Sequence, residues 1–346
     1  MKCISMSFLL AALAVAPLSR AQDEAAAPAG VERLQAEARG LERLVETKLG
    51  AQFLGATSDL PRLESTRTIY LRRSDRVWLD ADAWAALPPE EQETFAPIEI
   101  DEWFHYTTRY GSSLAYVRAL DLLAQHGFDT IDRGRILDYG FGAIGHLTLM
   151  ASLGAKVTGF DPDSMLIAAY GDDWRSFDVA RSDAARGPGP GGHVELVFDQ
   201  LADGERRHDR APSGAFDLFL SKNTLKRGYV HPEREVDPRM TIDIGADDET
   251  YVRHLHELLR PGGHVMIYNL SPKRSGPDEA YIPWSDGRCP FDRDLLEAAG
   301  FEVLAYDVDD SAFIRDLGRA LGWDEQGMDL EGDLFAMYTI LRKPRE

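Results

Sequence analysis

The chain has 346 residues, of which 44% are hydrophobic and 28% charged, and its formal net charge is −20. This length and composition predict a globular protein with a substantial apolar core, in one large domain or two modest ones. The acidic balance argues against a nucleic-acid partner, because binding a polyanion requires clustered cations. Two cysteines, Cys3 and Cys289, cannot build a disulfide framework, and without CxxC or HExxH patterns no metal site is predicted.

The N-terminal residues have the layout of a secretory signal. Lys2 precedes an apolar stretch at 8–18, and residues 19–21 form a small-x-small pattern typical of a cleavage site. The apolar run is too short to predict a membrane span. We therefore expect residues 1–21 to be a removed signal peptide, which predicts an exported protein, periplasmic or secreted, with no stable membrane span afterwards. The alternatives are a helix that stays attached, or a start placed too early and a cytoplasmic protein.

The first hundred residues predict a small unit before the main domain. Residues 22–30 are acidic and rich in alanine, which indicates a flexible leader. Further along, strand-like runs at 68–72 and 76–79 predict a β-hairpin. We expect 31–111 to form an α+β appendage, whose role the sequence does not state, and 112–346 to form the main domain.

The stretch 135–163 predicts one half of a nucleotide-binding crossover. A short apolar run ends in Asp138, three glycines follow, apolar residues recur at helical spacing, and a second buried strand ends in Asp161. The pattern is strand, glycine turn, helix, strand. Glycines let a backbone approach a ligand closely, and a helix N-terminus offers N–H groups to it.

The glycine spacing alone fits two kinds of cofactor. Gly140, Gly142 and Gly145 match the G-x-G-x-x-G pattern of dinucleotide-binding proteins, a short pattern with frequent false positives. Asp138, two residues before the first glycine, would repel a pyrophosphate and attract a cationic ligand. Asp161, at the tip of the second strand, is placed to accept hydrogen bonds from both hydroxyls of a ribose.

The segment resembles motif I of class I S-adenosylmethionine (SAM)-dependent methyltransferases, an acid-x-Gly-x-Gly-x-Gly pattern followed by a second acid. In this chain the family's third glycine falls on Ile144, with Gly145 one place late. The resemblance implies SAM as the cofactor. It also implies that Asp138, the glycine loop and Asp161 bind it.

Later segments resemble the same family. Residues 215–221 resemble motif IV, and 259–263 resemble its Leu-x-Pro-Gly-Gly turn, which leads into a fifth strand. Runs at 301–308 and 334–342 predict the last two strands. The resemblance therefore implies an α/β, Rossmann-like, doubly wound and mostly parallel seven-stranded sheet with a closing antiparallel hairpin.

The resemblance implies further cofactor contacts. Asp199 ends the third predicted strand, where an acid in this family commonly meets the adenine amino group; the alternative is a solvated strand-end aspartate. Ser221 ends the fourth strand. An aromatic residue before motif I can shield the sulfonium by a cation–π contact. Tyr110 is our candidate, and the alternative is that the aromatic residues there pack the appendage onto the core.

The loop after the fourth strand, 222–232, is predicted to bind the acceptor, because ligands of open α/β sheets bind beyond the carboxyl ends of strands at the switch point. Lys222, Asn223 and Arg227 are the candidate contacts, and His231 is the candidate base. Lys222, Arg227 and His231, together with Lys226, predict a cationic cluster, which favours an anionic small-molecule acceptor. The alternative for each is a solvated loop residue.

These patterns predict a SAM-dependent methyltransferase acting on a small-molecule acceptor. Methyl transfer is an in-line displacement, so holding the two reactants in line can supply much of the catalysis, and no catalytic residue is required. An NAD(P)-dependent oxidoreductase and a non-catalytic SAM-binding protein remain alternatives. Asp138 and the 259–263 turn argue against the first.

Overall fold

The computed structural model describes residues 30–63, 66–108, 111–171 and 174–345. The expected signal peptide, the leader up to residue 29 and Tyr110 lie outside these residues. Gly30, which the sequence places in the leader, is the first residue of helix α1. No helix of the described ranges is both long and apolar enough to cross a bilayer.

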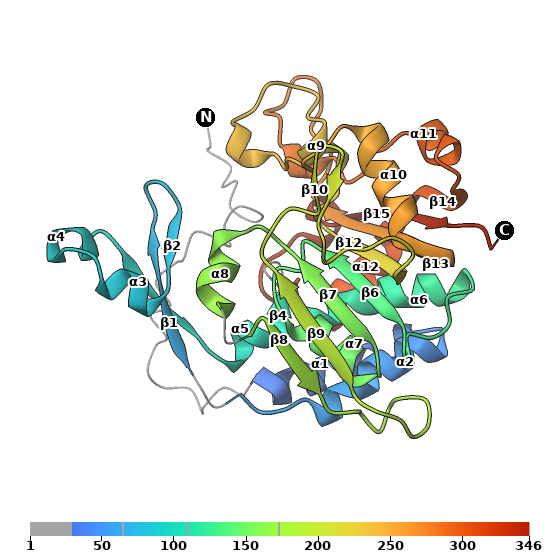
Figure 1. The fold of residues 1–346 in the computed structure, drawn as a ribbon, viewed down its shortest axis with the longest axis horizontal. Helices are drawn as coiled ribbons and strands as arrows, with labels where there is room; N and C mark the ends of the chain where they lie inside the picture. Colours follow the sequence, from blue (N-terminus) through green and yellow to red (C-terminus); the bar gives the residue numbers. More distant parts are fainter. Residues whose placement is uncertain (1–29, 64–65, 109–110, 172–173, 346) are drawn as a thin grey trace.

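A central sheet of eight strands within the described residues organises the molecule (Figure 1), in the order β14-β15-β13-β12-β6-β7-β9-β8. The strands are β6 (Arg135–Tyr139), β7 (Lys156–Phe160), β8 (Ser176–Val179), β9 (Gly192–Val197), β12 (Phe216–Lys222), β13 (Leu259–Ser271), β14 (Glu302–Asp309) and β15 (Phe335–Arg342). From β9 to β13 the neighbours pair in parallel, whereas β15 is antiparallel to both β13 and β14.

This topology confirms the predicted fold class. The sheet is Rossmann-like, doubly wound and mostly parallel, and β14 and β15 form the closing antiparallel hairpin. The chain runs outwards from β6 to β7 and β9, then returns to β12 on the other side of β6, so the switch point lies between β6 and β12. The predicted strand count of seven is wrong by one. The extra strand, β8, is a four-residue edge strand antiparallel to β9, too short and too polar for a sequence pattern to show.

Helices cover both faces of the sheet, as the near-continuous burial of its central strands requires. They are α1 (Gly30–Leu41), α2 (Lys48–Gly55), α3 (Ala81–Ala85), α4 (Pro89–Gln92), α5 (Glu102–Tyr106), α6 (Val117–Gln125), α7 (Gly145–Ser152), α8 (Ser164–Tyr170), α9 (Arg227–Val230), α10 (Asp248–Leu258), α11 (Arg293–Ala298), α12 (Ser311–Ala320) and α13 (Leu330–Asp333). One apolar core lies under α6, α7, α8 and α12, and the other lies under α10 and α11.

Short 3-10 helices and strand pairs complete the fold. The 3-10 helices are η1 (Glu42–Leu44), η2 (Ala56–Asp59), η3 (Ser113–Tyr116), η4 (Pro238–Met240) and η5 (Pro283–Ser285), and the two-residue strands are β4 (Thr107–Thr108), β5 (Gly111–Ser112), β10 (Ala202–Asp203) and β11 (Arg206–Arg207). Of these, η3 is the most important for the site, because it brings Tyr116 into the main core.

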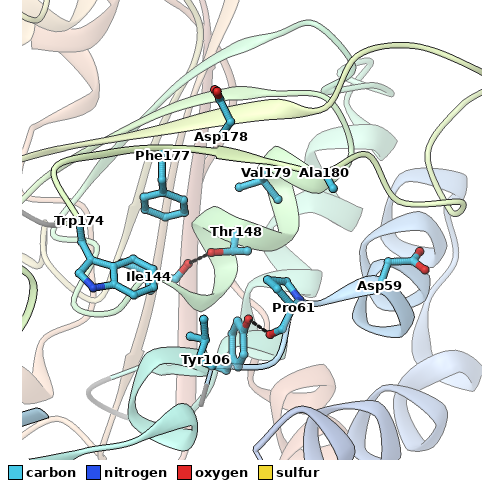
Figure 2. A pocket seen from close by; sticks show the side chains of 11 residues that line it. Asp59, Pro61, Tyr106, Ile144, Thr148, Trp174, Phe177, Asp178, Val179 and Ala180 are labelled. Atoms are coloured by element: carbon cyan, nitrogen blue, oxygen red, sulfur yellow. Dashed lines mark hydrogen bonds between the residues drawn. The ribbon is translucent and has the colours of Figure 1, made fainter. Parts of the chain in front are cut away.

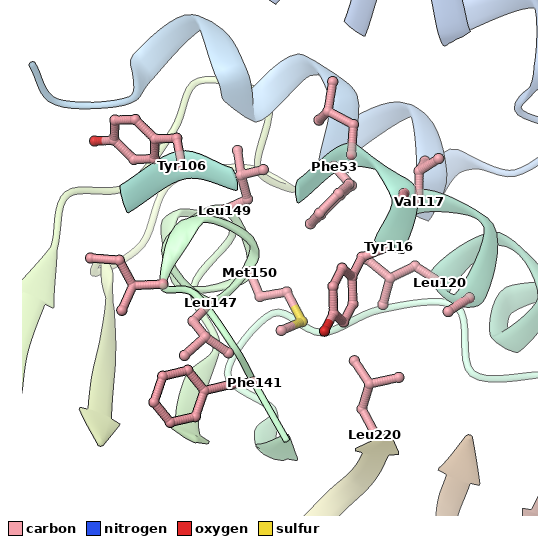
Figure 3. Packing of buried hydrophobic residues seen from close by; sticks show 14 of the residues in the cluster. Phe53, Tyr106, Tyr116, Val117, Leu120, Phe141, Leu147, Leu149, Met150 and Leu220 are labelled. Atoms are coloured by element: carbon pink, nitrogen blue, oxygen red, sulfur yellow. The ribbon is translucent and has the colours of Figure 1, made fainter. Parts of the chain in front are cut away.

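The predicted hairpin forms, and the helices before it pack on the main core. Strands β1 (Arg67–Arg72) and β2 (Val77–Leu79) pair antiparallel, and β3 (Ala96–Ile100) adds a third strand. This small sheet projects from the body with α3 and α4 (Figure 1). Helices α1 and α2, by contrast, share the main core: Phe53 of α2 lies in one apolar cluster with Tyr116 and Leu220 (Figure 3).

A buried carboxylate attaches α2 to α6. Asp121 has 0% of its surface exposed, and its Oδ1 accepts hydrogen bonds from the backbone nitrogen of Thr47 at 2.8 Å and from the Thr47 hydroxyl at 2.6 Å. The backbone nitrogen of Glu46 donates to the same carboxylate at 3.3 Å. Because Thr47 is the N-cap of α2, Asp121 fixes the start of that helix against α6.

We expect Asp121→Ala to lower the free energy of unfolding by about 3 kcal/mol, because buried donors lose a charged acceptor. Chemical denaturation followed by circular dichroism measures this change. Glu46→Ala is the matched control: it removes an exposed neighbouring carboxylate, and its effect should stay within about 0.5 kcal/mol. Equal effects of the two variants would contradict this role of Asp121.

Candidate functional site

The glycine loop connects the carboxyl end of β6 to the start of α7, and it lies beside the carboxyl end of β7. Gly140 and Gly142 have φ angles of +79° and +63°, a conformation that side chains other than glycine rarely adopt. Oδ2 of Asp161 accepts a hydrogen bond from the backbone nitrogen of Gly142 at 3.2 Å, and Oδ1 accepts one from the backbone nitrogen of Asp163 at 3.0 Å. The carboxylate of Asp161 is therefore held at the end of β7, directly against the loop.

Two of the loop's glycines also accommodate the chain's own packing. A Cβ atom at Gly140 would collide with the side chain of Thr224, which follows β12. One at Gly145 would collide with Ser113 and with the backbone of Tyr106. The late third glycine thus begins α7 in close contact with the segment before motif I.

Asp138 is the centre of a buried polar cluster. It has 0% of its surface exposed, and its Oδ2 lies 2.5 Å from Nε2 of His146, on the first turn of α7. The imidazole stacks on the ring of Tyr116, with centroids 3.7 Å apart and planes 8° apart. The other oxygen, Oδ1, has no hydrogen-bond partner within the described structure.

Lys222, the last residue of β12, lies in the same cluster. It is 5% exposed, and its Nζ lies 5.2 Å from the centroid of the Tyr116 ring. Burial lowers the pKa of Lys222 to about 8, and the negative charge of Asp138 opposes this shift. Burial also raises the pKa of Tyr116, and the carboxylates of Asp138 and Asp161 raise it further. The ring of Tyr116 therefore lies near both acids of the predicted cofactor site.

The sequence did not identify Tyr116 or His146 as parts of this site. Tyr116 lies before motif I, in the part of the chain where the sequence predicted an aromatic residue at the site. The residue chosen there was Tyr110, which lies outside the described residues. Tyr106 packs the N-terminal region onto the core, which was the alternative role for these aromatic residues. It is buried, and its hydroxyl donates to the carbonyl of Pro61. The sequence could have predicted the contact of His146 with Asp138, because a histidine directly after the third glycine lies close to the first acid of motif I.

In the loop after β12, three of the four residues of the predicted cationic cluster have partners within the protein. Lys226 is 2% exposed, and its Nζ donates to the carbonyl of Leu270 at 2.5 Å. The guanidinium of Arg227 pairs with Asp292 at 3.0 Å. His231 pairs with Asp248, also at 3.0 Å. The loop folds back on neighbouring elements, where these three side chains have internal partners. Contacts of Arg227 and His231 with an anionic acceptor stay predictions.

Two other predicted residues shape the backbone at the end of β12. The hydroxyl of Ser221 accepts a hydrogen bond from the backbone nitrogen of Leu225 at 3.3 Å. Asn223 has a φ angle of +65°, and its Oδ1 accepts from the backbone nitrogen of Leu270 at 2.7 Å. These contacts hold the loop against β13. Ligand contacts of Ser221 and Asn223 stay predictions.

Asp199 lies beyond β9, the neighbour of β7 in the sheet. It is exposed, its Oδ1 accepts from the backbone nitrogen of Gln200 at 2.8 Å, and its Oδ2 lies 3.5 Å from His208. The parallel pairing of β7 with β9 places Asp199 at the same sheet edge as Asp161. A contact with adenine stays a prediction.

A cavity of about 410 Å³ lies beside α7 (Figure 2), within the usual size range of small-molecule sites. It is lined by Asp59, Pro61, Leu63, Tyr106, Ile144, Thr148, Trp174, Phe177, Asp178, Val179 and Ala180. Most of these side chains are apolar or aromatic. The side chains of Phe177 and Asp178 point to opposite sides of β8 (Figure 2), so Phe177 faces the cavity. Ile144 connects this cavity to the glycine loop.

Comparisons with known proteins found distant similarity to solved structures. No protein-family model and no curated protein matches the chain. The solved structure of the 4+2 cyclase SpnF matches with a TM-score of 0.41 and 15% identity, over 92% of this chain and 98% of that one. A SAM-dependent methyltransferase from Mesorhizobium loti matches with a TM-score of 0.38 and 18% identity, over 65% of this chain and 97% of that one. A SAM-dependent methyltransferase from Aquifex aeolicus matches with a TM-score of 0.34 and 15% identity, over 64% of this chain and 88% of that one.

These matches are too distant to assign a ligand or an acceptor. The order and directions of the strands, together with the motif I segment, are what make this chain resemble class I SAM-dependent methyltransferases. Function has to be argued from the site itself.

The two buried lysines make stability depend on pH. Burial lowers the pKa of Lys226 to about 7 and that of Lys222 to about 8, well below the value of an unfolded lysine. At pH values between the lowered pKa of each lysine and the pKa of an unfolded lysine, the unfolded chain binds more protons than the folded one. The free energy of unfolding therefore rises with pH in this range.

We expect Lys226→Met to flatten this rise between pH 7 and 8.5 by about 1 kcal/mol per pH unit, because the variant has one fewer proton to release on folding. Urea denaturation at several pH values measures the slope. Lys156→Met, which removes an exposed lysine at the start of β7, should keep the wild-type slope. Parallel curves for the wild type and Lys226→Met would contradict the prediction.

Proposed function

We propose that this chain is a SAM-dependent methyltransferase that acts on a small-molecule acceptor. The observation that carries the proposal is the position of Asp138, the glycine loop and Asp161. They lie at the carboxyl ends of the adjacent strands β6 and β7, next to the switch point with β12. Open α/β sheets bind their ligands at this place.

The residues present fit SAM on three counts. Oδ1 of Asp138 is a buried acceptor without a partner in the described structure, which suits an ammonium group. Gly140 and Gly142 keep the loop open to a ligand's close approach. Asp161, held by the loop, is placed for the ribose hydroxyls. Bound there, SAM would supply an electrophilic methyl group, and the protein's task would be to orient it and exclude water.

The alternative dinucleotide ligand fits less well. A pyrophosphate needs the N–H groups at the start of the helix after the glycine turn. Here Gly145, which starts α7, packs against Ser113 and Tyr106, and the buried carboxylate of Asp138 lies near the end of β6, just before the loop. Both features oppose a doubly charged phosphate group. A SAM-binding protein without catalysis has the same binding site, so only turnover separates it from an enzyme.

The acceptor that the structure supports is small and apolar. The cavity beside α7 is lined mostly by apolar and aromatic side chains, among them Trp174 and Phe177. Asp59 and Asp178 are its two charged lining residues, and it has no lysine, arginine or histidine in its lining. It adjoins the glycine loop through Ile144. Lys226, Arg227 and His231 of the loop after β12 have internal partners, which argues against an anionic acceptor at these three residues.

We expect Asp161→Ala to weaken binding of S-adenosylhomocysteine, the demethylated cofactor, at least tenfold, because hydrogen bonds to a charged group are worth about 1.5–3 kcal/mol each. Isothermal titration calorimetry measures this loss. Asp163→Ala is the control: Asp163 caps α8 through the backbone nitrogen of Met165, so its loss should lower stability by about 1 kcal/mol and leave affinity unchanged. Tight NAD binding with no binding of S-adenosylhomocysteine would refute the proposal.

We also expect turnover with neutral apolar compounds that carry a hydroxyl or amino group, and none with phosphorylated ones. Formation of S-adenosylhomocysteine from SAM across a panel of both kinds tests this expectation. Val179→Phe, which narrows the cavity, should reduce turnover about tenfold or more while keeping the affinity for S-adenosylhomocysteine. Turnover that is confined to anionic compounds, or unaffected by Val179→Phe, would remove the cavity from the acceptor site.

A further inference from the structure

Two oppositely charged side chains, Lys222 and Asp138, are buried at the sheet's switch point, and each has one polar atom without a hydrogen-bond partner among the described residues. Nζ of Lys222 makes no hydrogen bond or ion pair with any described residue; its recorded contact is with the ring of Tyr116. Oδ1 of Asp138 is likewise without a partner there. An unpaired buried charge is costly, so chains rarely keep one without a use.

Lys226, by contrast, is a buried lysine whose ammonium has a hydrogen-bond partner within the fold. Lys226 is buried to the same degree as Lys222, but its ammonium donates to the carbonyl of Leu270 at 2.5 Å. Lys222 has no such carbonyl. The contrast indicates that packing alone does not explain the Lys222 ammonium.

The strand register brings the two unpaired groups to one place. Strands β12 and β6 are parallel neighbours, and Leu220 lies opposite Asp138. Lys222, two residues further on, therefore projects from the same edge and the same side of β12 as Leu220. Tyr116 contacts Lys222 and, through His146, is linked to Asp138. A cation and an anion thus belong to one cluster at the methionine end of the proposed SAM site.

We propose that Lys222 binds the α-carboxylate of the cofactor's methionine portion, so that Lys222 and Asp138 together recognise an α-amino-acid zwitterion. The inference rests on the proposed function and assigns Lys222 to the cofactor, not to the acceptor. Coulomb attraction fixes the orientation, because the α-ammonium is drawn to Asp138 and repelled by Lys222. A ligand without the carboxylate brings a second cation to a cluster in which Lys222 is already one, and it adds no anion beside Asp138.

Three probes isolate the carboxylate. S-adenosylhomocysteine has both charged groups, its decarboxylated analogue keeps only the ammonium, and 5′-methylthioadenosine lacks both. Calorimetry should show that the wild-type protein binds S-adenosylhomocysteine at least tenfold more tightly than the decarboxylated analogue. Equal or tighter binding of the analogue would overturn the assignment of Lys222.

Variants then connect the preference to Lys222. Lys222→Met should lose at least tenfold in affinity for S-adenosylhomocysteine, lose the preference over the analogue, and bind 5′-methylthioadenosine like the wild type. Lys222→Arg should keep the preference, and Lys226→Met, a matched loss of a buried lysine, should keep it as well. A Lys222→Met protein that retains the preference would overturn the inference while leaving the proposed function intact. Failure of the wild type to bind any of the three probes would refute the proposed function itself.

Discussion

The burial of one carboxylate sets the arrangement of the whole site. Asp138 has no exposed surface, and a buried charge must be balanced by nearby polar or charged groups. His146 comes from α7, Tyr116 from η3 and Lys222 from β12, so three separate elements converge on one acid at the end of β6. Replacing any of these side chains changes the environment of the others, because their charges interact in a medium of low dielectric constant.

This convergence explains why helices α1 and α2 belong to the core. Asp121 holds the start of α2 against α6, and α6 directly follows η3, which supplies Tyr116. Gly145 completes the contact by allowing Ser113 and Tyr106 to pack on the start of α7. The segment before motif I therefore closes the site from one side, which is a role that its sequence does not state.

The loop after β12 shows how tertiary contacts change the meaning of charged residues. In the sequence, Lys222, Lys226, Arg227 and His231 form one cationic group. In the structure, Arg227 pairs with Asp292 and His231 with Asp248, while Lys226 donates to a backbone carbonyl. Only Lys222 remains without such a partner, so the group divides into structural cations and one candidate ligand-binding ammonium.

The sequence by itself determined the fold class, the motif I crossover and the predicted positions of Asp138 and Asp161. Such features depend on local periodicity and on glycine's backbone freedom, which neighbouring residues encode. Only the tertiary structure decided that β8 adds an eighth strand, that Tyr116 and His146 surround Asp138, and which cations are paired. Burial and pairing depend on contacts between residues far apart in the chain, such as Arg227 with Asp292, and no local pattern records them.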